Sequence, residues 1–224
     1  MKSNFRSAFL DTVPVMTGYL FLGFGFGILA LQNGLSIWWA LAMSLFIYAG
    51  SMQFVAVTML SGSVSLLTAA LTTLAVNARH LFYGLSMIDR YKGTGKKKSY
   101  LIFALTDETY SLVSQGAPRQ DGGKYYFLVS FLDQCYWVLG TLLGAAVGQL
   151  LPINYEGIDF VLTALFVTIF VEQWLSTKNH LPACVGLFAS ILCLAIFGSG
   201  SFLIPSMGLI ALILLLTRKK EENK

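Results

Sequence analysis

Residues 64–88 read VSLLTAALTTLAVNARHLFYGLSMI, an apolar run in which Arg79 is the one formally charged side chain. The apolar character extends backwards, because no other formally charged residue occurs between Thr12 and Ile88. A stretch of this kind predicts membrane-spanning helices, and a guanidinium at bilayer depth costs at least ~2.5 to 3.5 kcal/mol unless it is paired or hydrated. We therefore expect a compensating group near Arg79, and we expect that group to belong to the functional site.

The composition also indicates a membrane protein. Hydrophobic residues make up 56% of the chain, charged residues make up 12%, and the mean hydropathy is +0.69. An ordinary soluble domain has roughly 25% charged residues, so this chain has too little polar surface to cover a globule in water. The net charge of +4 comes mainly from basic runs beside apolar segments, which indicate topology rather than nucleic-acid binding.

Hydropathy and turn residues divide the chain into apolar segments of helical length. Strands of a membrane barrel would alternate in polarity over short runs, and no such alternation is visible. The predicted fold is an all-α, polytopic membrane helix bundle that forms a single transmembrane domain over residues 1–224. The expected segments are 12–32, 36–60, 64–88, 99–117, 125–150, 157–176, 181–197 and 201–217.

The chain contains a weak internal repeat. Gly25–Phe54 aligns with Gly144–Trp174, because each copy runs from a glycine-rich helix through a turn into a helix that closes on Gln and an aromatic residue. Membrane transporters are often built from such repeats. We expect repeat 1 over about 12–88, a connecting loop and helix over 89–124, repeat 2 over about 125–197, and a C-terminal helix over 201–217.

The basic residues predict how the segments are oriented. Three full crossings before the basic loop Arg90–Lys98 would place it outside, against the positive-inside rule, whereas two crossings place it inside. One early segment is therefore expected to be broken or re-entrant, at Gly23–Gly27 or at Ala49–Ser51. With one span at 99–117, loop 118–124 lies outside, the repeats have inverted topology and both termini are cytoplasmic. Eight complete spans with parallel repeats are the alternative.

Arg79 and His80 are the first candidate site residues. The guanidinium suits a carboxylate from substrate or protein, and the imidazole titrates near neutral pH. The run Thr106–Tyr110 supplies two carboxylates inside an apolar segment, Asp107 and Glu108. Either one can neutralise Arg79, accept from a substrate ammonium or carry a proton. The alternatives are a structural ion pair or a snorkelling side chain for Arg79, and a water-facing interface for the two acids.

Other polar residues occur at membrane depth, and a lone amide in a helix bundle more often joins helices than binds a ligand. Gln53, Gly50 and Asn77 are further candidates for substrate binding or coupling: Gln53 and Gln173 occupy equivalent places in the repeat, and Gly50 lies at a predicted helix break. The remaining polar positions are Asp133, Gln134, Thr168 and Glu172.

The sequence offers little for catalysis. It contains no phosphate-loop motif, no HExxH and no serine-nucleophile turn, so we expect no enzyme activity, no metal and no cofactor. An intramembrane hydrolase that uses His80, Asp107 and Glu108 is the enzymatic alternative.

Several features follow one another in order over residues 10–115: Pro14 with the spaced glycines up to Gly27, the turn Gly34–Ser36, and the runs Ala49–Phe54, Asn77–Gly84 and Thr106–Tyr110. In these features the chain resembles the AzlC family of branched-chain amino acid exporters. The resemblance implies an inner-membrane permease that moves leucine, isoleucine, valine or analogues out of the cell. It also implies a separately encoded, small membrane partner of the AzlD type.

The residues fit that substrate class. A zwitterion with an aliphatic side chain needs an anion site, a cation site and an apolar pocket. Arg79 or helix N-terminal amides, Asp107 or Glu108, and Phe, Leu and Met side chains are available for these roles. We expect export by proton-coupled alternating access, in which one carboxylate or His80 carries the proton. The alternatives are a carrier or channel for another small solute, or a membrane scaffold that transports nothing.

Overall fold

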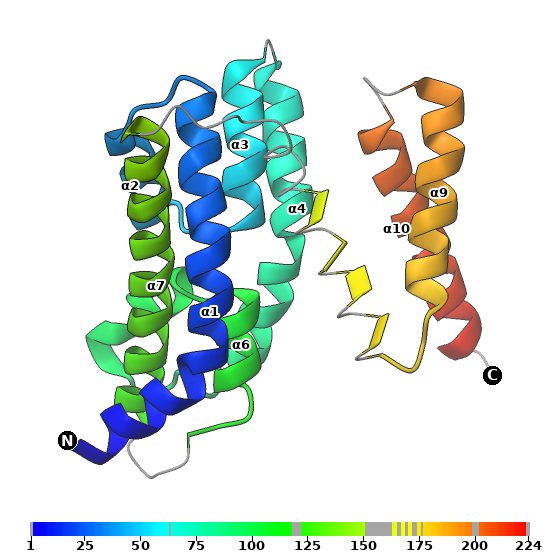
Figure 1. The fold of residues 1–224 in the computed structure, drawn as a ribbon. Helices are drawn as coiled ribbons and strands as arrows, with labels where there is room; N and C mark the ends of the chain where they lie inside the picture. The colour runs from blue at the N-terminus through cyan, green and yellow to red at the C-terminus, as the bar shows by residue number, and fades with distance from the viewer. Residues whose placement is uncertain are drawn as a thin grey trace. The chain divides into compact units, whose positions relative to one another are not determined.

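The computed structural model describes residues 2–62, 64–117, 122–150, 177–198 and 202–222, together with isolated residues between 163 and 175. The regular structure in these residues is helical, and none of them lies in a strand, in agreement with the all-helical prediction. The helices group into two compact units, and Figure 1 traces their order along the chain. The first unit comprises residues 1–64 and 76–165, and the second comprises 65–75 and 166–224.

Two long apolar helices lie side by side at the centre of the first unit (Figure 1). They are α1 (Lys2–Gln32) and α7 (Gly122–Leu150). Among the described helices, these two are long and apolar enough to cross a membrane, α1 over Asn4–Gln32 and α7 over its full length. Helix α1 is continuous through Gly23–Gly27, so the chain does not break at that glycine cluster.

Glycines allow α1 and α7 to approach very closely. A Cβ atom on Gly23 would lie 2.7 Å from the carbonyl oxygen of Trp137, and one on Gly144 would overlap the carbonyl group of Phe24. Such spacing leaves no room for a side chain, so the two backbones touch, as they do in small-xxx-small contacts between membrane helices. We name this contact the glycine seam, and it consists of Gly23, Gly27, Gly140 and Gly144.

Helices α1 and α7 run in the same direction. The Tyr125 hydroxyl donates to Asp11 at 2.8 Å near their starts, and Gly148 lies against Ile28 near their ends. The sequence prediction treats these helices as equivalent elements of inverted repeats, which would make them antiparallel. The inverted relation is therefore wrong for this pair. Much of the second copy beyond α7, including 151–162, lies outside the described residues.

The segment after α1 is interrupted. It consists of α2 (Ile37–Phe46), which packs on α7, and α3 (Ser51–Ser61), which packs on α1. Between them φ is +43° at Tyr48 and +32° at Gly50. This left-handed backbone ends one helix and starts the next, and it is adopted readily by glycine but rarely by other residues.

Helix α4 (Leu66–Met87) follows, and its residues from Val76 onward belong to the first unit. The basic loop after it contains one turn of 3₁₀ helix, Gly95–Lys97. In the second unit, α9 (Leu181–Phe197) packs on α10 (Leu203–Glu222).

A second interruption divides the predicted span 99–117. Helix α5 (Lys98–Phe103) is short, and α6 (Asp107–Val113) begins after a break of three residues. The Thr106 hydroxyl accepts a hydrogen bond from the Thr109 backbone N–H at 3.3 Å. Threonine at this N-cap position satisfies an otherwise unpaired N–H group, so the sequence itself encodes a helix start inside the apolar segment.

After α6 the chain returns to the end of the first unit that carries the basic loop. A Cβ atom on Gly116 would lie 3.1 Å from a guanidinium nitrogen of Arg90, and one on Gly123 would lie 3.4 Å from the Thr94 side chain. The residues on both sides of the gap at 118–121 therefore lie beside the basic loop. The predicted complete span before this point, with loop 118–124 on the opposite side, is wrong.

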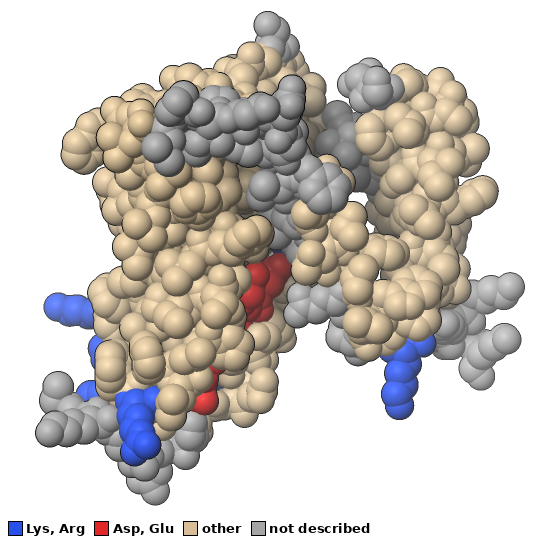
Figure 2. Space-filling view, in the orientation of Figure 1, with Lys and Arg blue, Asp and Glu red and all other residues tan. Residues whose placement is uncertain are grey.

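One apolar core cluster of the first unit lies at this same end. Its members come from α1, α4, α5, α6, α7 and the connecting residues: Ala8, Met87, Tyr91, Leu101, Leu105, Val113, Tyr125, Tyr126 and Val129. Large apolar side chains are also exposed, including Trp38 at 74% and Phe46 at 78%. In Figure 2, Lys and Arg side chains of this unit gather at one end, while most of its visible face carries no charge. Such a surface suits contact with lipid.

Candidate functional site

Arg79 joins the starts of two short helices. Its Nη1 atom lies 2.5 Å from Oδ2 of Asp107, the first residue of α6, and its Nη2 donates to the hydroxyl of Ser51, the first residue of α3, at 3.2 Å. Asp107 therefore compensates the guanidinium, as one of the two carboxylates that the sequence offers. The side chains of Arg79 and Asp107 are 25% and 28% exposed, so the pair is accessible from outside the core. We name Arg79, Asp107 and Ser51 the charged junction.

The helices at the junction extend toward opposite ends of the first unit, α3 in its upper half and α6 in its lower half (Figure 1). Their starts therefore meet near its middle, where Arg79 touches both. The first turn of an α-helix has free backbone N–H groups and a partial positive charge. Beside the guanidinium, the start of α3 adds to a local positive potential that is balanced by Asp107.

Glu108 does not join this ion pair but begins a chain of hydroxyl groups. The Tyr19 hydroxyl donates to Oε2 of Glu108 at 2.7 Å and lies 2.6 Å from Oγ1 of Thr106. The chain continues from Thr106 to the Thr109 hydroxyl at 3.0 Å, and Thr109 donates to Oδ2 of Asp133 at 2.7 Å. Asp133 lies on α7 and is completely buried. We name these five residues the hydroxyl chain.

Several buried polar atoms around the two networks have no hydrogen-bond partner within the part of the chain that the structure describes. They are Asp107 Oδ1, Arg79 Nε, the Tyr48 hydroxyl and Asp133 Oδ1. Buried polar atoms are normally paired, so these four atoms leave hydrogen-bonding capacity unused beside the two networks. No cluster of His, Cys, Asp and Glu among the described residues is arranged to hold a metal ion.

His80 and Asn77 are not part of the hydrogen-bonded junction. The His80 Nδ1 atom lies 3.3 Å from the carbonyl oxygen of Asn77, and its ring meets Tyr83 edge-on at 5.9 Å between centroids. Neither side chain hydrogen-bonds to Asp107 or Glu108. Of the adjacent pair Arg79 and His80, the structure brings the arginine alone into contact with the acidic run.

Gln53 lies on α3 and Gly50 directly before it, and within the described part of the chain neither hydrogen-bonds to Arg79 or Asp107. Gln53 is completely buried, and its Nε2 donates to Ser44 at 3.3 Å, which in turn lies 2.9 Å from Thr141. Gln53 thus joins α3 to α2 and α7 in the way that a lone amide is expected to. Gly50 precedes Ser51, and its positive φ would strain any other residue although the space around it is open.

Sequence reasoning missed Tyr19, Ser51 and Asp133 as members of the site. Tyr19 resembles any other aromatic residue of a glycine-rich helix, and Ser51 resembles a helix-packing serine. Asp133 carried a usable signal, because it is a carboxylate at membrane depth with no basic residue near it in the sequence. A lone acid in that position predicts either a protonated group or a distant partner.

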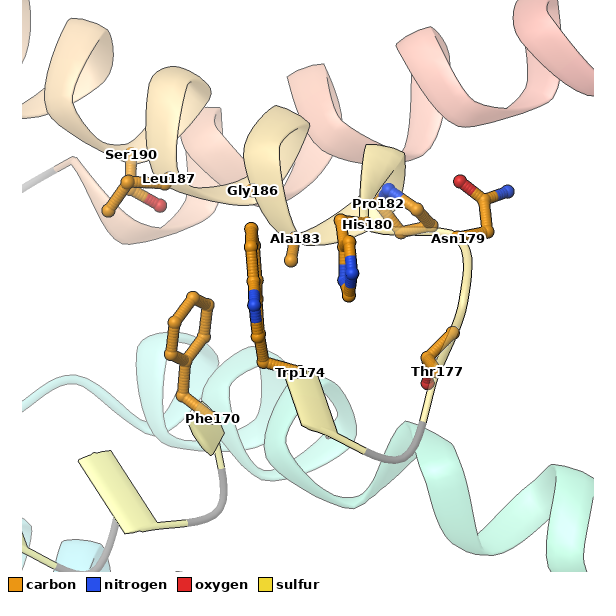
Figure 3. Close-up of a pocket in the computed structure, with 10 residues that line it drawn as sticks. All are labelled: Phe170, Trp174, Thr177, Asn179, His180, Pro182, Ala183, Gly186, Leu187 and Ser190. Carbon is orange, nitrogen blue, oxygen red and sulfur yellow. The ribbon is translucent and has the colours of Figure 1, made fainter. Parts of the chain in front are cut away.

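The second unit contains a different concave feature, a cavity of about 500 Å³ (Figure 3). Trp174 and His180 stack in its wall, with ring centroids 4.1 Å apart and planes 12° apart, and His180 Nδ1 has no partner among the described residues. No Asp, Glu, Lys or Arg occurs among the described lining residues. These are Phe170, Trp174, Thr177, Asn179, His180, Pro182, Ala183, Gly186, Leu187 and Ser190.

Comparison with known proteins identifies relatives over nearly the whole chain. Residues 14–151, which include the charged junction and the hydroxyl chain, match the family model for the AzlC protein. The chain is 46% identical to the branched-chain amino acid transport protein AzlC of Bacillus subtilis, over 98% of this chain and 87% of that protein. It is 43% identical to an uncharacterized membrane protein of Helicobacter pylori, over 97% and 96%, and 31% identical to the inner membrane protein YgaZ of Escherichia coli, over 85% and 82%. No solved structure matches the chain.

Proposed function

The chain belongs to the AzlC family, and on that premise we propose that it exports branched-chain amino acids across the cytoplasmic membrane. The name of the Bacillus relative supports the substrate class. The observation that carries the proposal is the ion pair between Arg79 and Asp107, which lies where two short helices start inside an apolar bundle.

The ion pair suits a zwitterionic substrate. Arg79 and Asp107 compensate each other at 2.5 Å. A zwitterion can replace this contact without changing the net charge, because its carboxylate takes the guanidinium while its ammonium takes Asp107. The Ser51 hydroxyl and the first-turn amides of α3 lie beside Arg79 and favour the carboxylate further.

Aromatic side chains on the same helix faces suit the aliphatic part of the substrate. Tyr83 follows Arg79 by four residues on α4, and Tyr110 follows Asp107 by three residues on α6, spacings that keep each pair on one face. The rings of Tyr83 and Tyr110 stack with centroids 4.4 Å apart. We propose that this aromatic pair forms the apolar wall of the substrate site.

The interruptions between α2 and α3 and between α5 and α6 support alternating access. Irregular backbone at membrane depth is tolerated where protein or a water-filled path supplies hydrogen-bond partners. The short helices at the junction can then shift against the long helices to open the site to either side. The positive-inside rule places the basic loop on the cytoplasmic side, and a small AzlD-type membrane protein is the proposed partner.

We propose that transport is coupled to protons. Glu108 is adjacent in sequence to Asp107 but is separate from the ion pair, and it accepts a hydrogen bond from Tyr19 instead. A carboxyl group next to the substrate site, but not occupied by Arg79, is suited to carry a proton while Asp107 binds the ammonium.

The test is counterflow of labelled L-leucine in vesicles that contain the protein and its partner, with and without a pH gradient. We expect counterflow that unlabelled isoleucine and valine inhibit and that D-leucine does not, together with net movement driven by the gradient. A carrier for another solute would show flux without this stereoselective competition. Correctly inserted protein that gives no leucine counterflow contradicts the proposal.

A further inference from the structure

Asp133 is a buried acid that the proposed substrate site does not use. It lies on the long helix α7 with none of its surface exposed, and its Oδ1 has no partner among the described residues. Its Oδ2 accepts one hydrogen bond, from Thr109 at 2.7 Å. An ionised carboxylate in such a place lacks the cation or the several donors that would compensate its burial.

Among the described residues, no cation has a hydrogen bond or ion pair to Asp133. Arg79 is bound to Asp107 and Ser51 instead. The titratable groups that interact electrostatically with Asp133 are either acidic or phenolic, and they come from every neighbouring element: Glu108 of α6, Tyr19 of α1, Tyr48 of the α2–α3 turn, Tyr100 of α5 and Tyr125 of α7 itself. Of these groups Glu108 can carry a negative charge of its own, so ionisation of both acids would place two negative charges close together, whereas the phenols are neutral.

The hydroxyl chain is one hydrogen short when both of its acids are ionised. It has four oxygen–oxygen contacts between Glu108 and Asp133, but Tyr19, Thr106 and Thr109 supply only three hydroxyl hydrogens. One contact is then left without a hydrogen, with two oxygen atoms 2.6 to 3.0 Å apart at the centre of the chain. A single added proton completes all four hydrogen bonds.

That proton can reside at either end. When Asp133 holds the added proton, the three hydroxyl hydrogens all point toward Glu108. When Glu108 holds it, they all point toward Asp133. Each hydroxyl accepts one hydrogen bond from the chain and donates one in both arrangements. The Thr106 oxygen also accepts the backbone N–H of Thr109 at 3.3 Å, which its second lone pair allows.

We infer that Glu108 and Asp133 share one proton through the hydroxyls of Tyr19, Thr106 and Thr109, and that Asp133 is the inner proton-binding site of the transporter. The inference rests on the proposed proton-coupled transport and names the groups that perform the coupling. When the proton moves from Glu108 to Asp133, Glu108 releases one hydrogen, each of the three hydroxyl oxygens receives one and passes one on, and Asp133 gains one, so the chain as a whole neither gains nor loses an atom. Glu108 is thereby left ionised beside the substrate site.

The decisive variant is Asp133→Asn, which keeps the size of the side chain and can still donate to Thr109. Because an amide does not titrate, the chain can no longer store the proton. We expect leucine counterflow within about twofold of the wild type and loss of leucine movement driven by a pH gradient. Thr109→Val, which breaks the chain and keeps the volume of the side chain, is expected to give the same result.

Ser130→Ala is the matched control. Ser130 is completely buried on α7 three residues before Asp133, but it does not belong to the hydroxyl chain. We expect this variant to keep both counterflow and gradient-driven movement. If Asp133→Asn also keeps gradient-driven movement, the inference is wrong, and it is equally wrong if that variant inserts correctly but loses counterflow.

Infrared spectroscopy provides a readout that does not depend on transport. We expect the purified protein, at the pH of the transport assay, to show the C=O stretch of a protonated carboxylic acid, and Asp133→Asn to lack that band. A wild-type spectrum without the band overturns the proton chain. If the wild-type protein shows the band but gives no leucine counterflow, the shared proton is supported and the proposed substrate is wrong.

Discussion

The charged junction of the first unit and the cavity of the second unit differ in what they can bind. The junction places an ion pair and the start of α3 together. The cavity offers about 500 Å³ with a stacked Trp174 and His180, but its described lining residues include no carboxylate, lysine or arginine. A zwitterion entering such a cavity would lose its hydration without gaining an ionic partner. For a zwitterion we therefore give the compensated charge of the junction more weight than the volume of the cavity in proposing the transport site.

The largest expected effect is that of Arg79→Ala on the junction. The change leaves Asp107 without its partner and removes the proposed carboxylate site, so we expect leucine counterflow to fall by about 100-fold or more. Arg90→Ala in the exposed basic loop is the control for arginine content and should leave counterflow near the wild-type rate. The measurement is the rate of leucine counterflow in vesicles that contain equal amounts of inserted protein. Normal counterflow in Arg79→Ala would show that the junction is not the substrate site.

The next prediction compares two ion pairs of equal length. Arg79–Asp107 is partly buried, whereas Lys92–Asp89 in the basic loop has side chains 70% and 84% exposed, and each pair is 2.5 Å long. We expect Asp107→Asn to lower counterflow by about tenfold, while Asp89→Asn has little effect because solvent screens an exposed pair. Kinetics over a range of leucine concentrations measure both. Equal effects of the two substitutions would show that burial of the pair is unimportant.

The glycine seam provides a test of the scaffold under the junction. In Gly144→Ala the new methyl group would overlap the Phe24 carbonyl, so α1 and α7 must separate, and we expect Tm in detergent to fall by roughly 5 °C or more. Gly18→Ala on α1 is the matched control, because no atom lies within 4 Å of the added Cβ. A thermal shift assay on both variants suffices. Equal Tm values would contradict the backbone contact.

The smallest effect is expected in the cavity. His180→Gln and Trp174→Ala change its stacked rings but no group of the junction, so we expect leucine counterflow within about twofold of the wild type. The measurement is the vesicle assay used for Arg79→Ala. A large loss in either cavity variant, with the protein inserted normally, would reverse the comparison and move the substrate site to the second unit.

Hydropathy and charge predict much of the first unit, because lipid imposes simple rules on segment length and on charge. They place helices near the observed ones and require an acid near Arg79. They do not distinguish Asp107 from Glu108, because neighbouring helical residues point about 100° apart and the choice depends on how α6 is rotated against α4. Tyr19 could not be selected either, since its partners Thr106 and Glu108 are remote in sequence.

The direction of α7 differs from the prediction for a specific reason. The predicted direction requires residues 99–117 to span the membrane, but the Thr106 cap starts a new helix inside that segment. The chain then returns to the end it left, with Gly116 against Arg90, and α7 therefore starts at that end. Local capping chemistry, which hydropathy averages over, thus accounts for the direction of α7.

The glycine seam also limits how this protein can move. Where backbone meets backbone between α1 and α7, no side chains remain that could change rotamer and let one helix slide or tilt over the other. We therefore expect the pair to stay rigid during the proposed transport cycle. Motion is then expected in the short helices that meet at Arg79, with α1 and α7 as the fixed frame against which they turn.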